Sequence, residues 1–146
     1  MKAYRFGLAA VAQVRRGQAL QARQEVARIL RQMERAFADE ACRAQLYQGF
    51  LESEQPVPGH AFMARFEQGE RLAATVAGAA RRRHELEGQL SQARQAALQA
   101  ERNLALLEKL DQRRRHEWVL AAQREDAAIL DEFATVRAAT RPKGAA

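Results

Sequence analysis

Proline occurs at only three of the 146 positions, and its placement constrains the fold more than any other feature. Pro56 and Pro58 lie in the segment SEQPVPG, residues 53–59, and Pro142 lies near the end of the chain. Two prolines and a glycine within four residues cannot continue a helix. The stretches on either side of this break carry no proline, so each can form one long helix. The sequence therefore predicts a helix over about 3–51, a turn over 52–59, a second helix over about 60–140 and a flexible tail over 141–146.

The composition favours helices over strands. Alanine occupies 32 positions, and Glu, Gln, Arg and Leu are also abundant; all five are strong helix formers. β-branched residues, which strands prefer, are scarce. A helix of about 80 residues would be about 120 Å long and would need a partner helix along its length. We therefore expect an all-α fold, built as a single coiled-coil domain over residues 1–146.

Apolar residues recur at alternating steps of three and four along both stretches. Such a repeat, 3.5 residues on average, is typical of coiled coils. A short break between two such helices predicts an antiparallel pair. The expected fold is a long antiparallel two-helix coiled-coil hairpin in which the second helix overhangs the first. The repeat positions are Leu8, Ala12, Arg15, Ala19, Ala22, Val26, Ile29 and Met33, then Leu72, Val76, Ala79, Arg83, Leu86, Leu90, Ala93, Ala97, Ala100, Leu104 and Leu107.

The unequal lengths of the two helices predict an unpaired arm. If Leu51 pairs near His60, then Leu8 pairs near Asn103, and the second helix continues alone for roughly 35 residues, or about 50 Å. Several apolar side chains on this arm, Leu104 to Thr140, would lack a partner within the chain. This favours docking on another protein over fold-back or dimerisation of the arm. The side chains concerned are Leu107, Leu110, Trp118, Ala121, Ile129, Leu130 and Phe133.

The net charge is +6, and most of the excess lies at the start of the chain. Residues 1–51 carry 9 basic and 4 acidic side chains, a net of +5. Such a surface could meet an acidic protein, nucleic acid or anionic lipid. The arginine runs 81–83 and 113–115 each ring a helix and do not line one face. We therefore expect an acidic protein surface as the partner of the basic region and do not expect nucleic acid.

The sequence offers no pattern for catalysis. Its three histidines lie far apart, and the single cysteine, Cys42, permits no zinc constellation of the common kinds. No glycine-rich phosphate loop follows a strand. We expect a protein that is not an enzyme and has no metal or cofactor. No apolar run near the start has the length of a signal peptide, and none approaches a membrane span, so we expect a soluble cytoplasmic protein.

Both ends of the chain resemble one family. The opening YRFGLAAV, residues 4–11, is followed by Arg15 and Arg16, and the second match begins with LEKL at 107–110. The match continues through RRRHEW at 113–118, QRED at 123–126, LDEFA at 130–134 and Arg137. In these segments, and in length and expected hairpin shape, the chain resembles the FliJ family, the small coiled-coil component of the flagellar type III export ATPase complex.

The resemblance implies a stalk that enters the hole of a hexameric export ATPase and promotes its assembly and activity. It also implies contact with the export gate at the membrane, escort of export chaperones, and peripheral association with the inner membrane. No cofactor is implied. The candidate ATPase-binding residues are Phe6, Leu8, Arg15, Arg113, Arg114, Trp118, Leu130, Asp131 and Phe133, and the candidate gate-binding residues are Phe62, Phe66, Leu72 and Val76.

Three other functions remain open. A nucleic-acid or membrane-surface binder would use residues 1–51, and its binding to polyanions would depend steeply on salt. The equivalent stalk of a virulence-type III secretion injectisome would have a similar length and shape, although Phe6, Leu8 and residues 130–132 favour the flagellar branch. A generic coiled-coil scaffold or adaptor would instead self-associate through its arm and would leave an ATPase unaffected.

Overall fold

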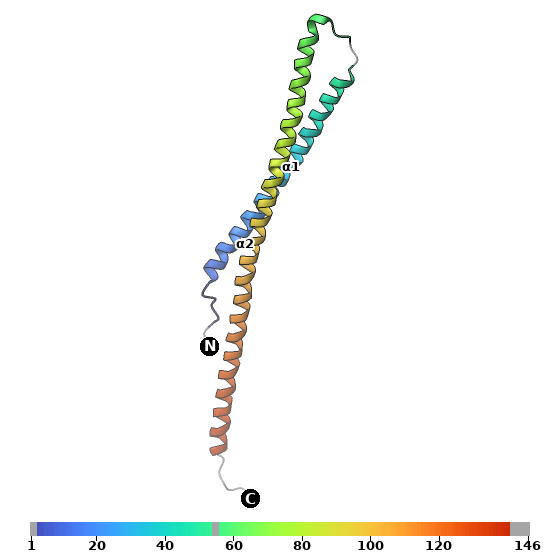
Figure 1. The fold of residues 1–146 in the computed structure, drawn as a ribbon. Helices are drawn as coiled ribbons and strands as arrows, with labels where there is room; N and C mark the ends of the chain where they lie inside the picture. The colour runs from blue at the N-terminus through green and yellow to red at the C-terminus, as the bar shows by residue number, and fades with distance from the viewer. Residues whose placement is uncertain (1–2, 54–55, 141–146) are drawn as a thin grey trace. The chain divides into compact units, whose positions relative to one another are not determined.

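A computed structural model describes residues 3–53 and 56–140 (Figure 1). The chain forms helix α1 (Ala9–Glu52), a short 3-10 helix η1 (Gly59–Ala61) and helix α2 (Phe62–Ala139). The described residues include no strand, so the predicted all-α class is confirmed. The predicted tail at 141–146 and positions 54–55 of the predicted turn lie outside the described residues.

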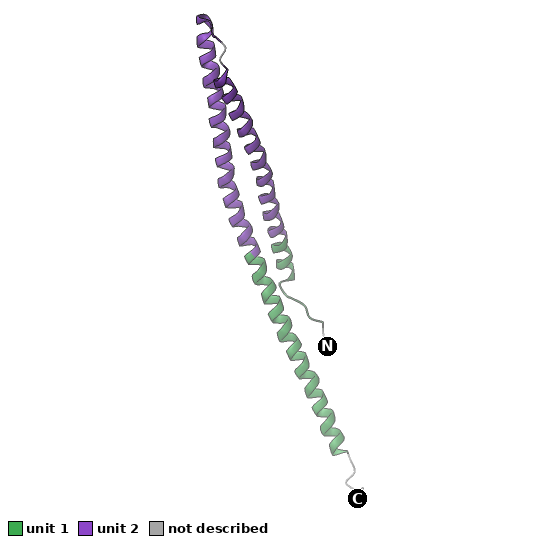
Figure 2. Cartoon of the chain, turned by 90° about the vertical axis from the view of Figure 1, so that its right-hand side faces the viewer, with its two compact units in different colours: residues 1–16, 102–146 green, residues 17–101 purple. Residues whose placement is uncertain are grey.

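The chain divides into two compact units, and each contains part of both helices (Figure 2). Unit 1 comprises residues 1–16 and 102–146, and unit 2 comprises residues 17–101. In unit 2, α1 and α2 run antiparallel, joined by the turn that the prolines predict (Figure 1).

The predicted apolar repeat forms the interface between the helices of unit 2. Every repeat position from 19 to 33 and from 72 to 100 is buried or half-buried. Leu86 is the most deeply buried side chain, 1% exposed, and Ile29 is 3% exposed. Alanine occupies many of the other positions, and its small side chain lets two helices pack closely at a modest gain from apolar burial. The seam is therefore correctly predicted from the three-four spacing.

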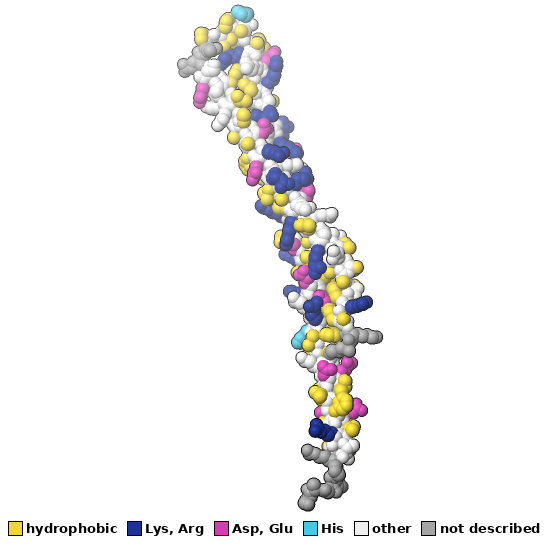
Figure 3. All heavy atoms as spheres, turned by 180° about the vertical axis from the view of Figure 1, so that it is seen from behind, with side chains coloured by type: hydrophobic (Ala, Val, Ile, Leu, Met, Phe, Trp, Pro, Cys, Tyr) yellow, Lys and Arg dark blue, Asp and Glu magenta, His cyan; other side chains and the backbone are white. Residues whose placement is uncertain are grey.

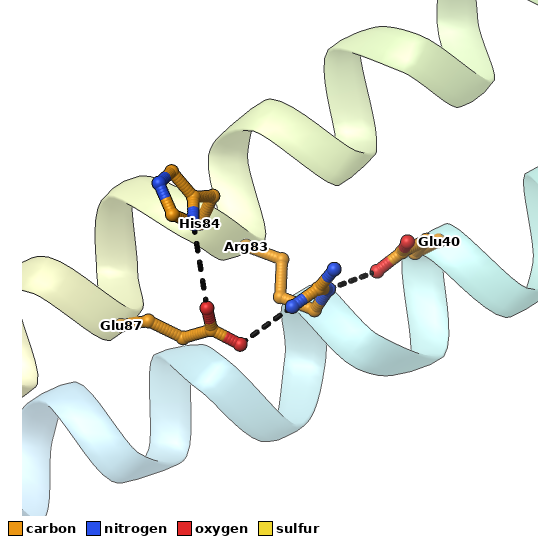
Figure 4. A network of polar contacts seen from close by, with 4 residues as sticks. All are labelled: Glu40, Arg83, His84 and Glu87. Atoms are coloured by element: carbon orange, nitrogen blue, oxygen red, sulfur yellow. Dashed lines mark hydrogen bonds and ion pairs between the residues drawn. The ribbon is translucent and has the colours of Figure 1, made fainter.

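Arg83 is the charged member of this seam, and its charge is paired across the two helices. Its Nε donates to Oε2 of Glu40 at 2.6 Å, and its Nη1 donates to Oε1 of Glu87 at 2.5 Å (Figure 4). The guanidinium also lies 5.5 Å from the ring centre of Phe37. Hydrogen bonding to Glu40 and Glu87 raises the pKa of Arg83 above its usual value. A polar pair in an apolar seam favours one register, because shifting the helices would separate Arg83 from Glu40 and leave the half-buried Glu40 carboxylate without its partner.

The pairing register differs from the one that a turn centred between Leu51 and His60 predicts. Glu40 pairs with Arg83, whereas the predicted register would place it opposite residue 71, twelve positions earlier. Arg23 pairs with Glu101 at 2.7 Å in nearly the same register as Glu40. The difference arises because the start of α2 extends beyond the end of α1 (Figure 1).

Helix α1 begins at Ala9, later than the predicted start near residue 3. The backbone N–H of Ala9 donates to the carbonyl oxygen of Phe6 at 3.1 Å, and the preceding residues are not helical. Gly7, a weak helix former, lies just before the start. The non-helical segment lets Tyr4 lie against α2 within unit 1, and the contacts it makes there offset the lost turn of helix.

Candidate docking site at the chain start and the end of the second helix

Tyr4 fastens the start of the chain to α2. Its hydroxyl donates to Oδ1 of Asp111 at 2.7 Å and lies 3.3 Å from the Asp111 carbonyl oxygen. The Tyr4 ring lies against Trp118, with ring centres 6.1 Å apart and planes inclined by 56°. The guanidinium of Arg115 lies 5.5 Å from the centre of the Tyr4 ring. These aromatic and cation–π contacts each contribute about 0.5–1.5 kcal/mol in typical proteins.

The same contacts change the acidity of the Tyr4 phenol. Desolvation of the half-buried hydroxyl raises its pKa, and the hydrogen bond to the Asp111 carboxylate and the charge of that carboxylate raise it further. Arg115 and Arg114 act in the opposite direction and are weaker. The phenol therefore stays neutral and keeps its donor proton throughout the physiological pH range.

The arginine run 113–115 is partly engaged within unit 1. Nε of Arg113 lies 3.2 Å from Oε1 of Glu117, and Nη2 of Arg115 lies 3.9 Å from Oδ2 of Asp111. Arg114 lies over the ring of Phe6, with its guanidinium carbon 6.0 Å from the ring centre. The structure thus brings Phe6 and Arg114 of the predicted ATPase-binding residues together and places Trp118 beside Tyr4, whereas Arg113 contacts Glu117 and neither of them.

The chain start covers part of the predicted arm. Leu107 and Asp111 line a shallow hollow together with Tyr4, Phe6 and Ala12. Leu107, Leu110 and Trp118 are half-buried, whereas the sequence predicted them to lack a partner. The prediction was wrong for these three residues because the register is displaced and because Tyr4 and Phe6 reach beyond the helix start. Leu8 and Arg15, two further predicted site residues, are half-buried as well.

Beyond Ala122 the arm is exposed. Every side chain from Gln123 to Thr140 is exposed, including the predicted residues Leu130, Asp131 and Phe133. Leu130 is 68% exposed and Phe133 is 69% exposed. From residue 123 to the helix end at 139 the arm has 17 residues and is about 25 Å long, roughly half the predicted length. Ile129, Glu132, Phe133 and Val136 line a groove on it.

The four predicted gate-binding residues occupy two different environments in unit 2. Phe62 and Phe66 are 60% and 56% exposed and line an apolar hollow beside the turn. Leu72 and Val76 are half-buried at seam positions of the interface between the helices. The structure therefore does not bring the four residues together on one surface.

The hollow beside the turn is also lined by residues that the sequence analysis does not identify as site residues. A Cβ atom built on Gly69 would lie 2.9 Å from Cε1 of Phe50, so only glycine allows the ring to approach this closely. The Arg65 guanidinium lies 4.7 Å from the Phe50 ring centre, and its Nη2 donates to the carbonyl oxygen of Ser53 at 2.9 Å. The available signal was the gathering of aromatic residues on both sides of the prolines: Tyr47, Phe50, Phe62 and Phe66.

The chain matches no family model, no curated protein and no solved structure.

No helix within the described ranges 3–53 and 56–140 is long and apolar enough to cross a membrane. In the same ranges, no group of three His, Cys, Asp or Glu side chains is placed to hold a metal ion. The features that remain are surfaces: an aromatic and arginine cluster at the chain start, an exposed apolar groove on the arm, and an apolar hollow beside the turn. Exposed apolar patches are typical of interaction sites in proteins.

Proposed function

We propose that the chain is the coiled-coil stalk of a flagellar type III export ATPase complex. In this proposal it is not an enzyme, and it acts in the cytoplasm at the inner-membrane face of the export apparatus. It binds the hexameric export ATPase, promotes its assembly and activity, contacts the export gate and escorts export chaperones. The proposal rests on the resemblance of both chain ends to the FliJ family.

The observation that carries the proposal is the exposed apolar end of α2 in unit 1. Leu130 and Phe133 are about two-thirds exposed. Covering such apolar side chains with a partner removes them from water, and this stabilises the complex. The chain start lies against the same helix through Tyr4 and Trp118. Residues of the chain start and the exposed end of α2 thus belong to the same unit, which supports a role for both in entering a ring lumen. Apolar anchors would supply affinity there, and Arg113 and Arg114 would steer the approach.

A steady-state assay of the cognate export ATPase, titrated with this protein, tests the proposal. We expect the full chain to stimulate ATP hydrolysis and Phe133→Ser to lose most of that stimulation. Leu106→Ser is the matched control, because Leu106 is 66% exposed on the same helix but lies on the opposite face. Circular dichroism checks that both variants keep their helices. Absence of stimulation by the unaltered chain, together with absence of co-purification, would overturn the proposal.

Two alternatives give different results in the same assay. An injectisome stalk would stimulate the ATPase of a virulence-type secretion system in preference to the flagellar one. A generic scaffold would affect neither enzyme, and its mass in solution would rise with concentration as arms paired with one another.

A further inference from the structure

The exposed groove of the arm is a continuation of a face that is already packed in unit 1. At 100° per residue, Trp118, Ala122, Ile129, Phe133 and Val136 all lie within a sector of about 60° on α2. Trp118 lies against Tyr4, and Ala122 is only 8% exposed. The other three are 51–69% exposed. The interface face of α2 therefore continues in phase beyond the residues that cover it, and a face of this kind is complementary to another helix.

Carboxylates border this stripe. Glu125 and Glu132 lie along one edge and Asp126 along the other, and Glu132 lines the groove itself. Residues 122–140 carry four acidic and two basic side chains, a net charge of −2. None of the four carboxylates forms an ion pair within the described part of the chain. Figure 3 shows acidic side chains beside the apolar atoms at this end of α2.

We propose that the stripe Ile129, Phe133 and Val136 binds an amphipathic helix of another polypeptide whose apolar seam is bordered by lysine or arginine. The stripe continues the spacing of a helix–helix interface, so a helix fits it best. The carboxylates along its edges favour a helix with basic side chains beside its apolar residues. A second copy of the same arm fits poorly, because its carboxylates would face these carboxylates across the seam. The inference rests on the proposed function only in taking the arm as a docking element, and it adds the chemistry of the partner.

Two designed peptides of about 21 residues, long enough to span the arm as helices, test this inference. Both carry the same leucine and alanine seam, and one has lysine while the other has glutamate at the flanking positions. Fluorescence anisotropy of the labelled peptides measures their binding to the full chain. We expect the lysine peptide to bind at least about tenfold more tightly at low salt, and the difference to shrink at high salt.

Variants of the full chain locate the binding. Phe133→Ser should weaken binding of the lysine peptide, and Leu106→Ser should leave it unchanged. The double variant Glu125→Gln, Glu132→Gln keeps the size of both side chains and should remove most of the preference for lysine over glutamate.

Several results would overturn the inference. These are equal binding of both peptides, binding of neither, or a dimer of the chain that Phe133→Ser abolishes in sedimentation. The proposed function fails separately. If the ATPase is stimulated but the lysine peptide does not bind, the stalk proposal stands and this inference fails. If the lysine peptide binds but the ATPase is not stimulated, this inference stands and the stalk proposal fails.

Discussion

A charged residue of the seam, Arg83, favours one alignment of the two helices of unit 2. Arg83 occupies a seam position where an apolar residue would bury more surface, yet it has a carboxylate partner on each helix, Glu40 on α1 and Glu87 on α2. Shifting one helix by a heptad would separate Arg83 from Glu40 and leave both charges half-buried without each other. The spacing of the sequence identifies Arg83 as the exception in the seam. It does not identify Glu40 as its partner, because that depends on the register, which the length of the turn decides.

At the same scale, the pKa of the Tyr4 phenol tests whether the chain start contacts α2 through Asp111. Its raised pKa means that the neutral phenol is favoured in the folded state. The stabilisation is fully present below the unfolded value of about 10, and it is lost as the pH rises through the folded pKa. In a Tyr47→Phe background, which leaves Tyr4 as the single tyrosine, we expect phenolate absorbance to appear with a midpoint above 10.

Asp111→Asn supplies the control for this titration. It removes the charge that the phenolate would face but keeps a hydrogen-bond acceptor, so the midpoint should move down toward 10. If the protein that keeps Asp111 showed a phenolate midpoint at or below 10, the contact between Tyr4 and Asp111 would be contradicted.

At the scale of elements, the sequence predicts the helices well and their alignment poorly. The three-four spacing predicts every seam position of unit 2 from Ala19 to Met33, because burial requires one continuous face. The start of α1 was predicted too early, because Tyr4 and Phe6 gain more from contacts on α2 than from another turn of helix. The exposed arm was predicted to be too long because α2 starts beyond the end of α1, which displaces the pairing of the two helices.

Two glycines of α2 make a matched prediction about the turn. Nothing lies within 4 Å of a Cβ added at Gly88, so Gly88→Ala should raise the free energy of unfolding by about 0.5–1 kcal/mol through helix propensity. At Gly69 the same gain is opposed by a 2.9 Å contact with Phe50, which must move away from Arg65. We expect Gly69→Ala to be less stable than Gly88→Ala by about 1 kcal/mol or more in urea denaturation. Equal stabilisation by both substitutions would contradict the packing of Phe50 against α2.

At the scale of the whole molecule, the described residues are mostly helical and most of their large apolar side chains are not buried. Seven apolar side chains among the described residues are buried, and four of them are alanine. Eighteen large apolar side chains of the same ranges are exposed. So little apolar burial contributes only weakly to the folding stability of a chain of this length. The sequence indicated this through its alanine content and predicted exposed anchors on the arm; Leu130 and Phe133 are exposed as expected, whereas Trp118 is covered by Tyr4.

The central proposal is that this chain serves as the stalk in the single central hole of a hexameric export ATPase. The most direct test is the mass of the complex, measured by sedimentation of the cognate export ATPase mixed with the full chain in the presence of a non-hydrolysable nucleotide. The account predicts a hexamer carrying a single chain, and a loss of bound chain with Phe133→Ser but not with Leu106→Ser. One chain per ATPase subunit, or an ATPase whose mass the chain leaves unchanged, would contradict it.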